Sequence, residues 1–289
     1  MKKILVTLAA ILIFASTLTF HLSPFTFHLN CAATASDEIS LPIVMYHSVL
    51  KSRKSKYVIT PAQLETDFQA YADMGYTPVF LREVIDYVEG RGALPPKPMV
   101  ITFDDGHYNN LSYALPVAQK FNFKFVVNVV TSFSSHSTES GDDSNPNYSY
   151  LTFAQMKELT DSGLVEIGNH THAMHKLKPR YGVGRKSGES DETYCTALRA
   201  DLEKSQQLIT SAGVVAPTTF AYPFGKYTPE CRTVLKDLGF KALLTCNEGI
   251  SQIRQGEPET LLTLKRYNRS GNTSTASFTK KVFGEIALP

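Results

Sequence analysis

The chain alternates short apolar runs with longer mixed stretches, several of which begin at a helix-capping residue. The apolar runs predict buried strands over residues 42–49, 78–80, 98–103, 123–130, 164–170, 218–225, 241–246 and 261–268. The stretches between them predict helices over residues 61–76, 82–90, 108–121, 193–212 and 229–238, with two more beginning after Thr152 and after Ser274. Thr60 and Thr152 are the expected N-caps, and Pro61 suits a first helical position.

Two polar segments interrupt this alternation. Residues 131–150 are rich in Ser, Asn and Asp, and together with residues 176–192 they are predicted to be long surface loops. Strands and helices otherwise alternate along nearly the whole length, without an internal repeat. This order predicts parallel strands joined by crossover helices, and the number of elements favours one closed or nearly closed (β/α) barrel over two domains.

In such a barrel the active site lies at the carboxyl ends of the strands. The predicted strands end in the following polar or turn-forming groups: His47; Asp104 and Asp105; Asn169 and His170; and Tyr222, Pro223, Phe224 and Gly225. We therefore expect these groups to converge on one face of the barrel.

The adjacent acids Asp104 and Asp105 have two interpretations. An Asp-Asp-Gly sequence is a common turn, because these residues accept turn conformations readily. Two neighbouring carboxylates also repel each other, and a bound cation relieves that repulsion. The sequence offers further ligands for such a cation, because residues 168–175 contain three histidines.

Asp105, His170 and His175 would supply one carboxylate and two imidazoles to a divalent ion. Three protein ligands with a position left open are typical of a catalytic zinc site. Asp104, beside a ligand but facing differently, would then act as the general base that takes a proton from water. Of the other histidines, His172 is interpreted as a loop residue between two ligands.

Three further polar side chains are given structural interpretations. His107 and His136 are expected in surface loops. Asn169 is expected to form hydrogen bonds within its own loop.

Three segments in order, TFDDG (residues 102–106), HT with a following His (residues 170–175) and YPFG (residues 222–225), resemble the polysaccharide deacetylases of the NodB-homology type, carbohydrate esterase family 4. The resemblance extends from about Leu41 to about Tyr267. It implies a distorted, incomplete (β/α)7 barrel, a first Asp that acts as base, and a second Asp and two His that hold a metal. The implied reaction hydrolyses the acetamide of N-acetylhexosamine units in a glycan.

The chain departs from the common family pattern in three ways. His170 and His175 are five residues apart instead of four, Ala221 stands where an Arg is usual, and no late Leu-and-His motif is visible. The segment MYHSV precedes the acidic pair instead. This arrangement is similar to the permuted branch that deacetylates poly-N-acetylglucosamine in bacterial biofilms.

That similarity assigns expected roles to further residues. His47 is implied as the acid that protonates the leaving amine. Tyr222, Pro223 and Phe224 are the expected substrate or oxyanion residues, and the Phe224 backbone N–H is an oxyanion donor. Arg266 and Arg269, at the end of a late strand, are the candidates to replace the missing Arg beside Asp104.

The N-terminus and the charge indicate where the protein acts. Lys2 and Lys3 precede an apolar run, and Ala33 and Ala35 frame a small-x-small cleavage site, which predicts a signal peptide over residues 1–35. An uncleaved membrane anchor is the alternative. A linker over residues 36–40 and a catalytic domain over residues 41–289 follow. The expected protein is bacterial, secreted or associated with the cell envelope.

The formal charge of +2, from 29 basic and 27 acidic residues, argues against a nucleic-acid surface, and the one basic run, residues 51–56, is interpreted as a solvated loop. Cys195, Cys231 and Cys246 do not make a disulfide framework. Either one Cys231–Cys246 bridge or free thiols remain possible.

The expected function is therefore a secreted, metal-dependent N-deacetylase that releases acetate from a polysaccharide containing N-acetylglucosamine. Zn²⁺ is the expected metal, with Co²⁺ or Mn²⁺ as alternatives. A membrane is a partner only if the N-terminal segment stays uncleaved. Two other function classes compete: a non-catalytic glycan-binding protein with a vestigial metal site, and a non-haem Fe(II) oxygenase, which also uses two His and one carboxylate.

Overall fold

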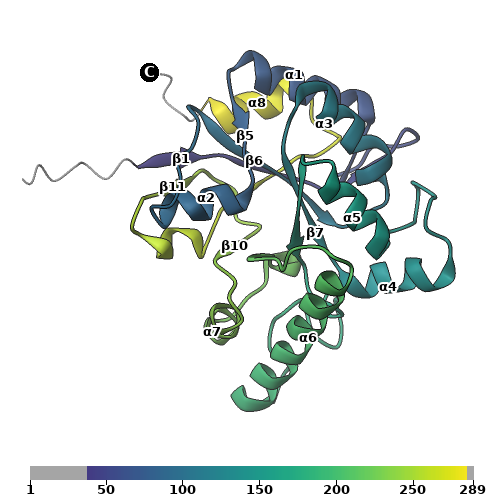
Figure 1. The fold of residues 1–289 in the computed structure, drawn as a ribbon, viewed down its shortest axis with the longest axis vertical. Coiled ribbons are helices and arrows are strands. Elements are labelled where there is room, and N and C mark those ends of the chain that lie inside the picture. The colour runs from purple at the N-terminus through teal and green to yellow at the C-terminus, as the bar shows by residue number, and fades with distance from the viewer. Residues whose placement is uncertain (1–37, 285–289) are drawn as a thin grey trace, which may run out of the picture. The chain divides into compact units, whose positions relative to one another are not determined.

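A curved parallel sheet forms the centre of the fold in the computed structural model, which describes residues 38–284 (Figure 1). Its strands follow the order β10 (Ala242–Leu244), β9 (Thr219–Ala221), β8 (Val165–Asn169), β7 (Phe125–Val129), β6 (Pro98–Asp105), β2 (Ile43–Tyr46) and β12 (Tyr267–Asn268). β5 (Thr77–Pro78) pairs with β6 off this path. Within the described residues, one parallel bridge joins Leu244 of β10 to Leu264, three positions before the start of β12. The sheet therefore forms the distorted, incompletely closed barrel that the sequence predicted.

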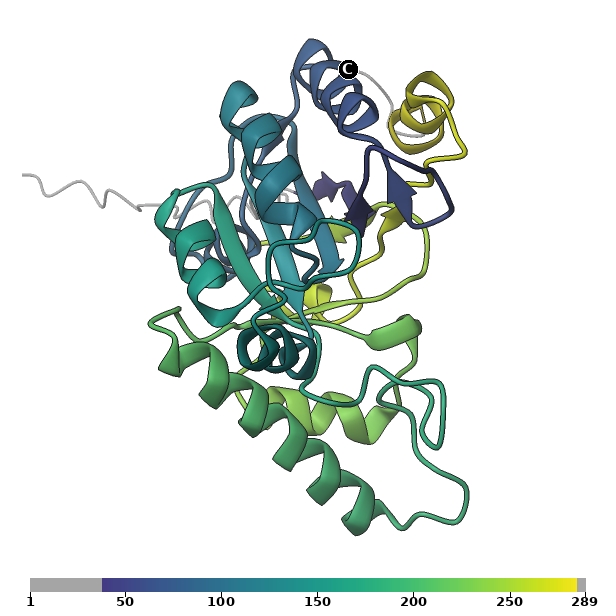
Figure 2. The same cartoon turned by 90° about the vertical axis from the view of Figure 1, so that its right-hand side faces the viewer.

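Helices connect the strands and cover the sheet. They are α1 (Pro61–Asp73), α2 (Leu81–Val88), α3 (Leu115–Phe121), α4 (Thr131–Ser140), α5 (Phe153–Asp161), α6 (Asp191–Ser211), α7 (Pro229–Asp237) and α8 (Thr275–Phe283). Short turns of helix are η1 (Asn110–Ala114), η2 (Pro223–Gly225) and η3 (Pro258–Leu261). α1 packs against α3 and α8, and α6 packs against α4 and α7. The long α6 is the green helix that crosses the lower part of Figure 2.

Two small sheets complete the structure. β1 (Ile39–Leu41) pairs antiparallel with β11 (Ser251–Ile253), and β3 (Ser48–Val49) pairs in parallel with β4 (Val58–Ile59). The first pair joins the beginning of the described chain to a segment more than two hundred positions later. Sequence patterns did not predict it, because each of its strands is only three residues long.

The helix N-caps predicted at Thr60 and Thr152 are confirmed in atomic detail. Thr60 accepts a hydrogen bond from the Gln63 backbone N–H, and the Gln63 side chain accepts one from the Thr60 N–H. Thr152 and Gln155 form the same reciprocal pair at the start of α5. Each pair satisfies two backbone donors that a helix start would otherwise leave open.

Aromatic side chains fill the layer between the sheet and its helices. Phe68 and Tyr71 of α1, Phe103 of β6 and Phe125 of β7 are all fully buried in one cluster. Phe103 and Phe125 meet edge to face, with ring centroids 5.2 Å apart. This packing holds β6 and β7 in place, and β6 carries the acidic pair at its end.

The structure corrects several sequence predictions. Residues 131–140 form helix α4, so the prediction of a loop over residues 131–150 is wrong for its first half. The helix predicted from residue 193 begins at Asp191, with Ser190 as its N-cap. Only Tyr267 and Asn268 of the strand predicted over residues 261–268 are in a named strand.

The N-terminal and cysteine predictions have different outcomes. The signal peptide predicted over residues 1–35 lies outside the described residues and stays a prediction. Over residues 38–284, no helix is both long and apolar enough for a transmembrane span. Cys195, Cys231 and Cys246 are free thiols, so the alternative of a Cys231–Cys246 bridge is wrong.

Candidate active site

The candidate groups meet at the carboxyl ends of the parallel strands, as predicted. His47 lies between β2 and β3, and Asp104 and Asp105 are the last two residues of β6. His170 directly follows β8, and His175 follows five residues later in the same loop. The parallel register of β2, β6, β7 and β8 brings these ends together.

Asp105, His170 and His175 form a cluster that can hold a metal ion. Their candidate ligand atoms all lie within 4.8 Å of one another. Nε2 of His175 lies 3.2 Å from Oδ1 of Asp105, and Nε2 of His170 lies 3.7 Å from the same oxygen. Ligand atoms bound tetrahedrally to one zinc ion are separated by about 3.4 Å, given bonds of roughly 2.0–2.2 Å. The cluster therefore fits a single ion of this size.

The tautomer of His170 suits metal binding. Its Nδ1 donates a hydrogen bond to the Ala221 carbonyl over 2.7 Å, which leaves the Nε2 lone pair facing Asp105. Burial lowers the pKa of His170 to about 4, so the ring is neutral near pH 7. A neutral ring fixed by a backbone carbonyl is the usual form of a metal-binding histidine.

Asp104 is paired with Arg266 inside the barrel. Nη1 and Nη2 of Arg266 lie 2.8 Å and 2.9 Å from the two Asp104 oxygens, and the Asn128 amide donates to one of them over 2.8 Å. Burial tends to raise the pKa of Asp104, but Arg266 and nearby histidines outweigh it and lower the pKa to about 2. Of the two candidate arginines, Arg266 therefore contacts Asp104, whereas Arg269 pairs with Asp67.

His47 faces the same pocket. Its Nδ1 is buried and has no hydrogen-bond partner among the described residues, and its ring lies 4.8 Å from that of Tyr57. The Asn110 side chain, in the π-helical turn η1, donates to the His47 carbonyl over 3.0 Å. Burial lowers the pKa of His47, while Asp105 and Asp104 oppose that shift.

His107 was predicted in a surface loop but lies against the cluster. Its Nε2 is 3.5 Å from Oδ2 of Asp105, whereas His170 and His175 approach Oδ1. The ring stacks on Tyr150 at 5.0 Å. Burial tends to raise the pKa of Asp105, but hydrogen bonds from His107 and His175 hold it well below its usual range.

Asp201 of α6 is a further residue that sequence reasoning missed. Its carboxylate accepts hydrogen bonds from the backbone N–H groups of His172 and Ala173, over 3.0 and 2.9 Å. These bonds fix the loop between His170 and His175. No local sequence pattern indicates this contact, because Asp201 lies on α6, 29 positions after His172.

The remaining histidines stay outside the cluster. His172 pairs with the Thr131 hydroxyl over 3.0 Å, and His136 is exposed on α4. Asn169 accepts a hydrogen bond from the Thr171 N–H within its own loop, as predicted.

Unfavourable backbone conformations concentrate around the cluster. Asp105, Thr171 and Phe224 have φ values of 75°, 78° and 56°. For residues other than Gly, such angles cost roughly 1–3 kcal/mol each and persist where the surroundings enforce them. Gly168 meets a related constraint, because a Cβ there would lie 2.2 Å from the Asn128 side-chain oxygen. The chain thus tolerates strain at the positions that orient the candidate site.

The pocket over this cluster measures about 600 Å³. Phe224 forms part of its wall, with its ring 4.5 Å from that of His175 and 5.1 Å from that of Tyr181. Tyr222 and Pro223, the other two expected substrate residues, are buried and do not line the pocket. Of Tyr222, Pro223 and Phe224, only Phe224 lines the pocket.

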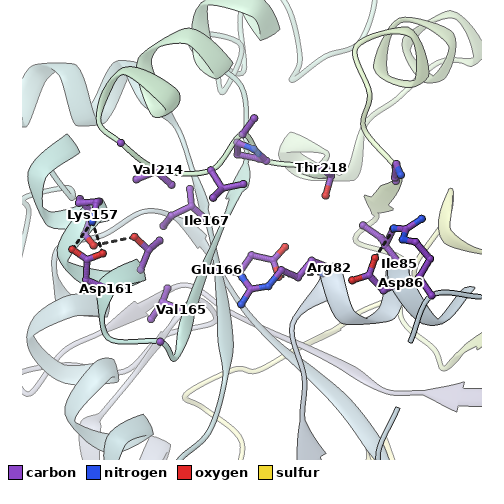
Figure 3. Close-up of a pocket in the computed structure, with 18 residues that line it drawn as sticks. Arg82, Ile85, Asp86, Lys157, Asp161, Val165, Glu166, Ile167, Val214 and Thr218 are labelled. Atoms are coloured by element: carbon purple, nitrogen blue, oxygen red, sulfur yellow. Dashed lines mark hydrogen bonds and ion pairs between the residues drawn. The ribbon is translucent and has the colours of Figure 1, made fainter. Parts of the chain in front are cut away.

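A second pocket, of about 540 Å³, lies at the opposite, amino-terminal ends of the strands (Figure 3). Its charges are already satisfied in several places: Lys157 pairs with Asp161, and Glu166 accepts the Arg82 backbone N–H at the start of α2. It contains neither a histidine nor a cysteine. This pocket therefore lacks a metal-ligand set like that of Asp105, His170 and His175 at the other end.

Comparisons with known proteins agree with this geometry. Residues 91–243, more than half of the chain, match the family described as polysaccharide deacetylase. The poly-beta-1,6-N-acetyl-D-glucosamine N-deacetylase of Escherichia coli strain K12 is 26% identical over 78% of this chain and 35% of its own length. The Staphylococcus aureus strain MRSA252 protein of the same name is 25% identical over 64% of this chain and 60% of its own length. The chain thus spans less than two thirds of each of these relatives.

Solved structures show the same fold. A de-N-acetylase from Aggregatibacter actinomycetemcomitans matches with a TM-score of 0.72 at 22% identity, covering 84% of this chain and 99% of that one. The BpsB deacetylase domain from Bordetella bronchiseptica matches with a TM-score of 0.63 at 25% identity, covering 78% and 94%. The incomplete barrel, the clustered strand ends and the matched segment agree, and this chain belongs to the polysaccharide deacetylase family.

Proposed function

We propose that the protein is a metal-dependent N-deacetylase that hydrolyses the acetamide of N-acetylglucosamine units in a polysaccharide and releases acetate. The single observation that carries the proposal is the Asp104–Arg266 pair beside the Asp105, His170 and His175 cluster. Relatives named as poly-beta-1,6-N-acetyl-D-glucosamine N-deacetylases support that polymer as the first substrate to test.

In this proposal Asp105, His170 and His175 hold the ion, for which Zn²⁺ is the first choice. When bound, such an ion polarises a carbonyl and lowers the pKa of a bound water to about 7. Asp104 is ionised throughout the neutral range, because Arg266 keeps its pKa near 2. It therefore accepts the proton of the attacking water, and Arg266 stabilises its position by two hydrogen bonds.

His47 donates a proton to the departing nitrogen. Amide cleavage requires such a donor, because an amine anion is a very poor leaving group. Burial lowers the pKa of His47, so only a fraction of the ring is protonated near pH 7. The Phe224 backbone N–H is the proposed hydrogen-bond donor to the developing oxyanion.

Two variants test these roles. Asp104→Asn should abolish acetate release from N-acetylglucosamine oligomers while the purified protein keeps its bound metal, measured by elemental analysis. His47→Ala should slow amide hydrolysis more than hydrolysis of an activated acetate ester, whose leaving group needs less protonation. Acetate release that persists in Asp104→Asn would remove the base assignment, and an amide rate equal to wild type in His47→Ala would remove the acid assignment.

The competing proposal of a glycan-binding protein with a vestigial metal site is less well supported. A binding protein has no use for an ionised carboxylate held by a buried arginine beside the candidate ligands. A metal-loaded protein that binds these oligomers but releases no acetate would favour that alternative. The Fe(II) oxygenase alternative lacks its usual β-sandwich, because this sheet is parallel and covered by helices.

Secretion is a separate proposal that rests on the sequence of residues 1–35. Export and cleavage after Ala35 would place the catalytic domain, residues 41–289, where it can reach an extracellular or envelope polysaccharide. N-terminal sequencing of the protein recovered outside a bacterial host would test the cleavage. A retained N-terminus in the membrane fraction would favour the anchor instead.

A further inference from the structure

The one basic run of the chain, residues 51–56, reaches the active-site pocket. The sequence predicts a solvated loop here, and the side chains of this run are indeed largely exposed. Two of them, Arg53 and Lys56, also line the pocket that contains Asp104, Asp105 and the histidines. We call Arg53 and Lys56 the entrance cations.

The entrance cations have no acidic partner among residues 38–284, whereas the acids Asp104 and Glu248 at the same pocket each pair with another cation. Asp104 pairs with Arg266, and Glu248, at the same pocket, pairs with Lys281 over 2.6 Å. Asp105 faces the histidines of the cluster. The side of the pocket that meets solvent therefore carries uncompensated positive charge, and a bound divalent ion would add to it.

Aromatic rings accompany this charge. Nζ of Lys56 lies 5.2 Å from the centroid of the Tyr57 ring, which in turn lies 4.8 Å from His47. Tyr181 and Phe224 stack at 18° on another part of the wall, and they are 48% and 37% exposed. Exposed ring faces offer apolar contact area to the C–H faces of a sugar, and the cations offer partners for a negative group.

We propose, building on the deacetylase function above, that the entrance cations bind a glycan that carries an anionic group, a carboxylate or a phosphate, close to the N-acetylated sugar. A neutral poly-N-acetylglucosamine chain offers these cations hydroxyl and carbonyl oxygens but no opposite charge. Each deacetylation also creates an amine, which is cationic once protonated, and like charge at the entrance disfavours that product. The charges thus favour an acidic glycan and the release of a deacetylated one.

Binding measurements on the Zn²⁺-loaded Asp104→Asn variant separate recognition from turnover. The probes are oligosaccharides that alternate N-acetylglucosamine with glucuronate, the same oligosaccharides with methyl-esterified carboxylates, an oligomer bearing a phosphate instead, and neutral chito-oligosaccharides. The acidic probes should bind more tightly than the ester by about two- to fivefold for each cation engaged. This factor corresponds to the free energy that an exposed ion pair contributes. Comparing carboxylate with phosphate identifies which anion fits.

Charge-removing substitutions locate the effect. Arg53→Gln or Lys56→Gln, added to Asp104→Asn, should each reduce the acid-over-ester preference, and the two together should reduce it further than either alone. Lys54→Gln is the matched control, because Lys54 lies in the same basic run, is exposed and does not line the pocket. The preference should also disappear in 1 M NaCl, where the screening length falls to about 3 Å.

Equal binding of acid and ester would overturn the proposal, as would an equal loss in Lys54→Gln. Failure of the deacetylase function has a different signature. If wild-type protein releases acetate from the chito-oligosaccharides without favouring acidic probes, the deacetylase function stands and the proposed recognition of an anionic group is refuted. Wild-type protein that releases no acetate from any probe loses the function, whether or not Asp104→Asn prefers the acidic ones.

Discussion

The Arg266–Asp104 pair makes the stability of the protein depend on pH, and removing Arg266 should reverse the sign of that dependence. Both side chains are buried, Arg266 completely, and two hydrogen bonds join them. The substitution Arg266→Met keeps much of the side-chain volume and removes the charge. It leaves Asp104 buried with the Asn128 amide as its remaining hydrogen-bond donor among the described residues.

The magnitude follows from the pKa of Asp104. Its fall from 3.8 to about 2 corresponds to about 2 kcal/mol in favour of the ionised form, at 1.36 kcal/mol per unit. This is the net value after burial has acted in the opposite direction. Removing one partner of a buried ion pair therefore should cost more, about 3–5 kcal/mol at pH 7.

The direction in which stability changes with pH tests the reasoning as well as the size of the stability loss does. Because the folded pKa is lowered, wild-type protein gains this stability above pH 3.8 and loses it as the pH falls through 2. In Arg266→Met, burial is the main remaining influence and raises the pKa of Asp104 above 3.8. The variant should then become more stable, relative to wild type, as the pH falls through that raised pKa.

Urea denaturation of both proteins between pH 3 and pH 8 measures this difference, and the pH profile of acetate release measures its effect on Asp104 as the proposed base. The acid limb of that profile should move to higher pH in Arg266→Met. Arg269→Met is the matched control, since it removes a buried arginine from Asp67 and should destabilise without moving the limb. A stability gap independent of pH, with an unmoved limb, would refute the reasoning.

Three further predictions concern other parts of the fold. Glu166→Gln should raise the free energy of unfolding at pH 8 by up to about 3 kcal/mol, because burial raises the pKa of Glu166 from 4.5 to about 7; the gain should vanish below pH 4.5 in denaturant titrations. His107→Ala should weaken Zn²⁺ binding about tenfold or more in chelator competition, whereas His136→Ala, exposed on α4, should not. Gly182→Ala should lower the melting temperature, because its φ is +56° and a Cβ would lie 2.6 Å from the Pro223 carbonyl oxygen.

The barrel and the central cluster could be predicted because their signals are local. An apolar run followed at once by ionisable residues marks the end of a buried strand, as at Asp104 and His170. Parallel strands place such ends on one edge, so adjacency in space follows from the alternation of elements. Helix starts at Thr60 and Thr152 were equally readable from capping residues.

Helix α4 was missed because its buried face is polar. Thr131, Ser134 and Ser137 recur at helical spacing and are buried, although none of them is apolar. The Thr131 hydroxyl donates to that of Ser205 on α6, over 3.2 Å. A search for apolar periodicity overlooks a stripe of this kind, in which small hydroxyl side chains permit close helix packing.

The choice between Arg266 and Arg269 required the register of the last strand. Tyr267 lies opposite Val44 of β2, and successive side chains of a strand point to opposite faces. Arg266 therefore enters the barrel, while Arg269 reaches Asp67 on α1. The contact of His107 could not be predicted either, because it depends on the turn after β6, which brings the ring to Oδ2 of Asp105.

The late position of Arg266 means that the counter-charge of Asp104 is synthesised after all three candidate ligands. A nascent chain already contains the three candidate ligands once residue 175 has emerged, yet Asp104 still awaits its counter-charge from a segment about ninety positions further on. Premature termination before that segment would yield a polypeptide that retains Asp105, His170 and His175, the candidate ligands, while Asp104 lacks its counter-charge.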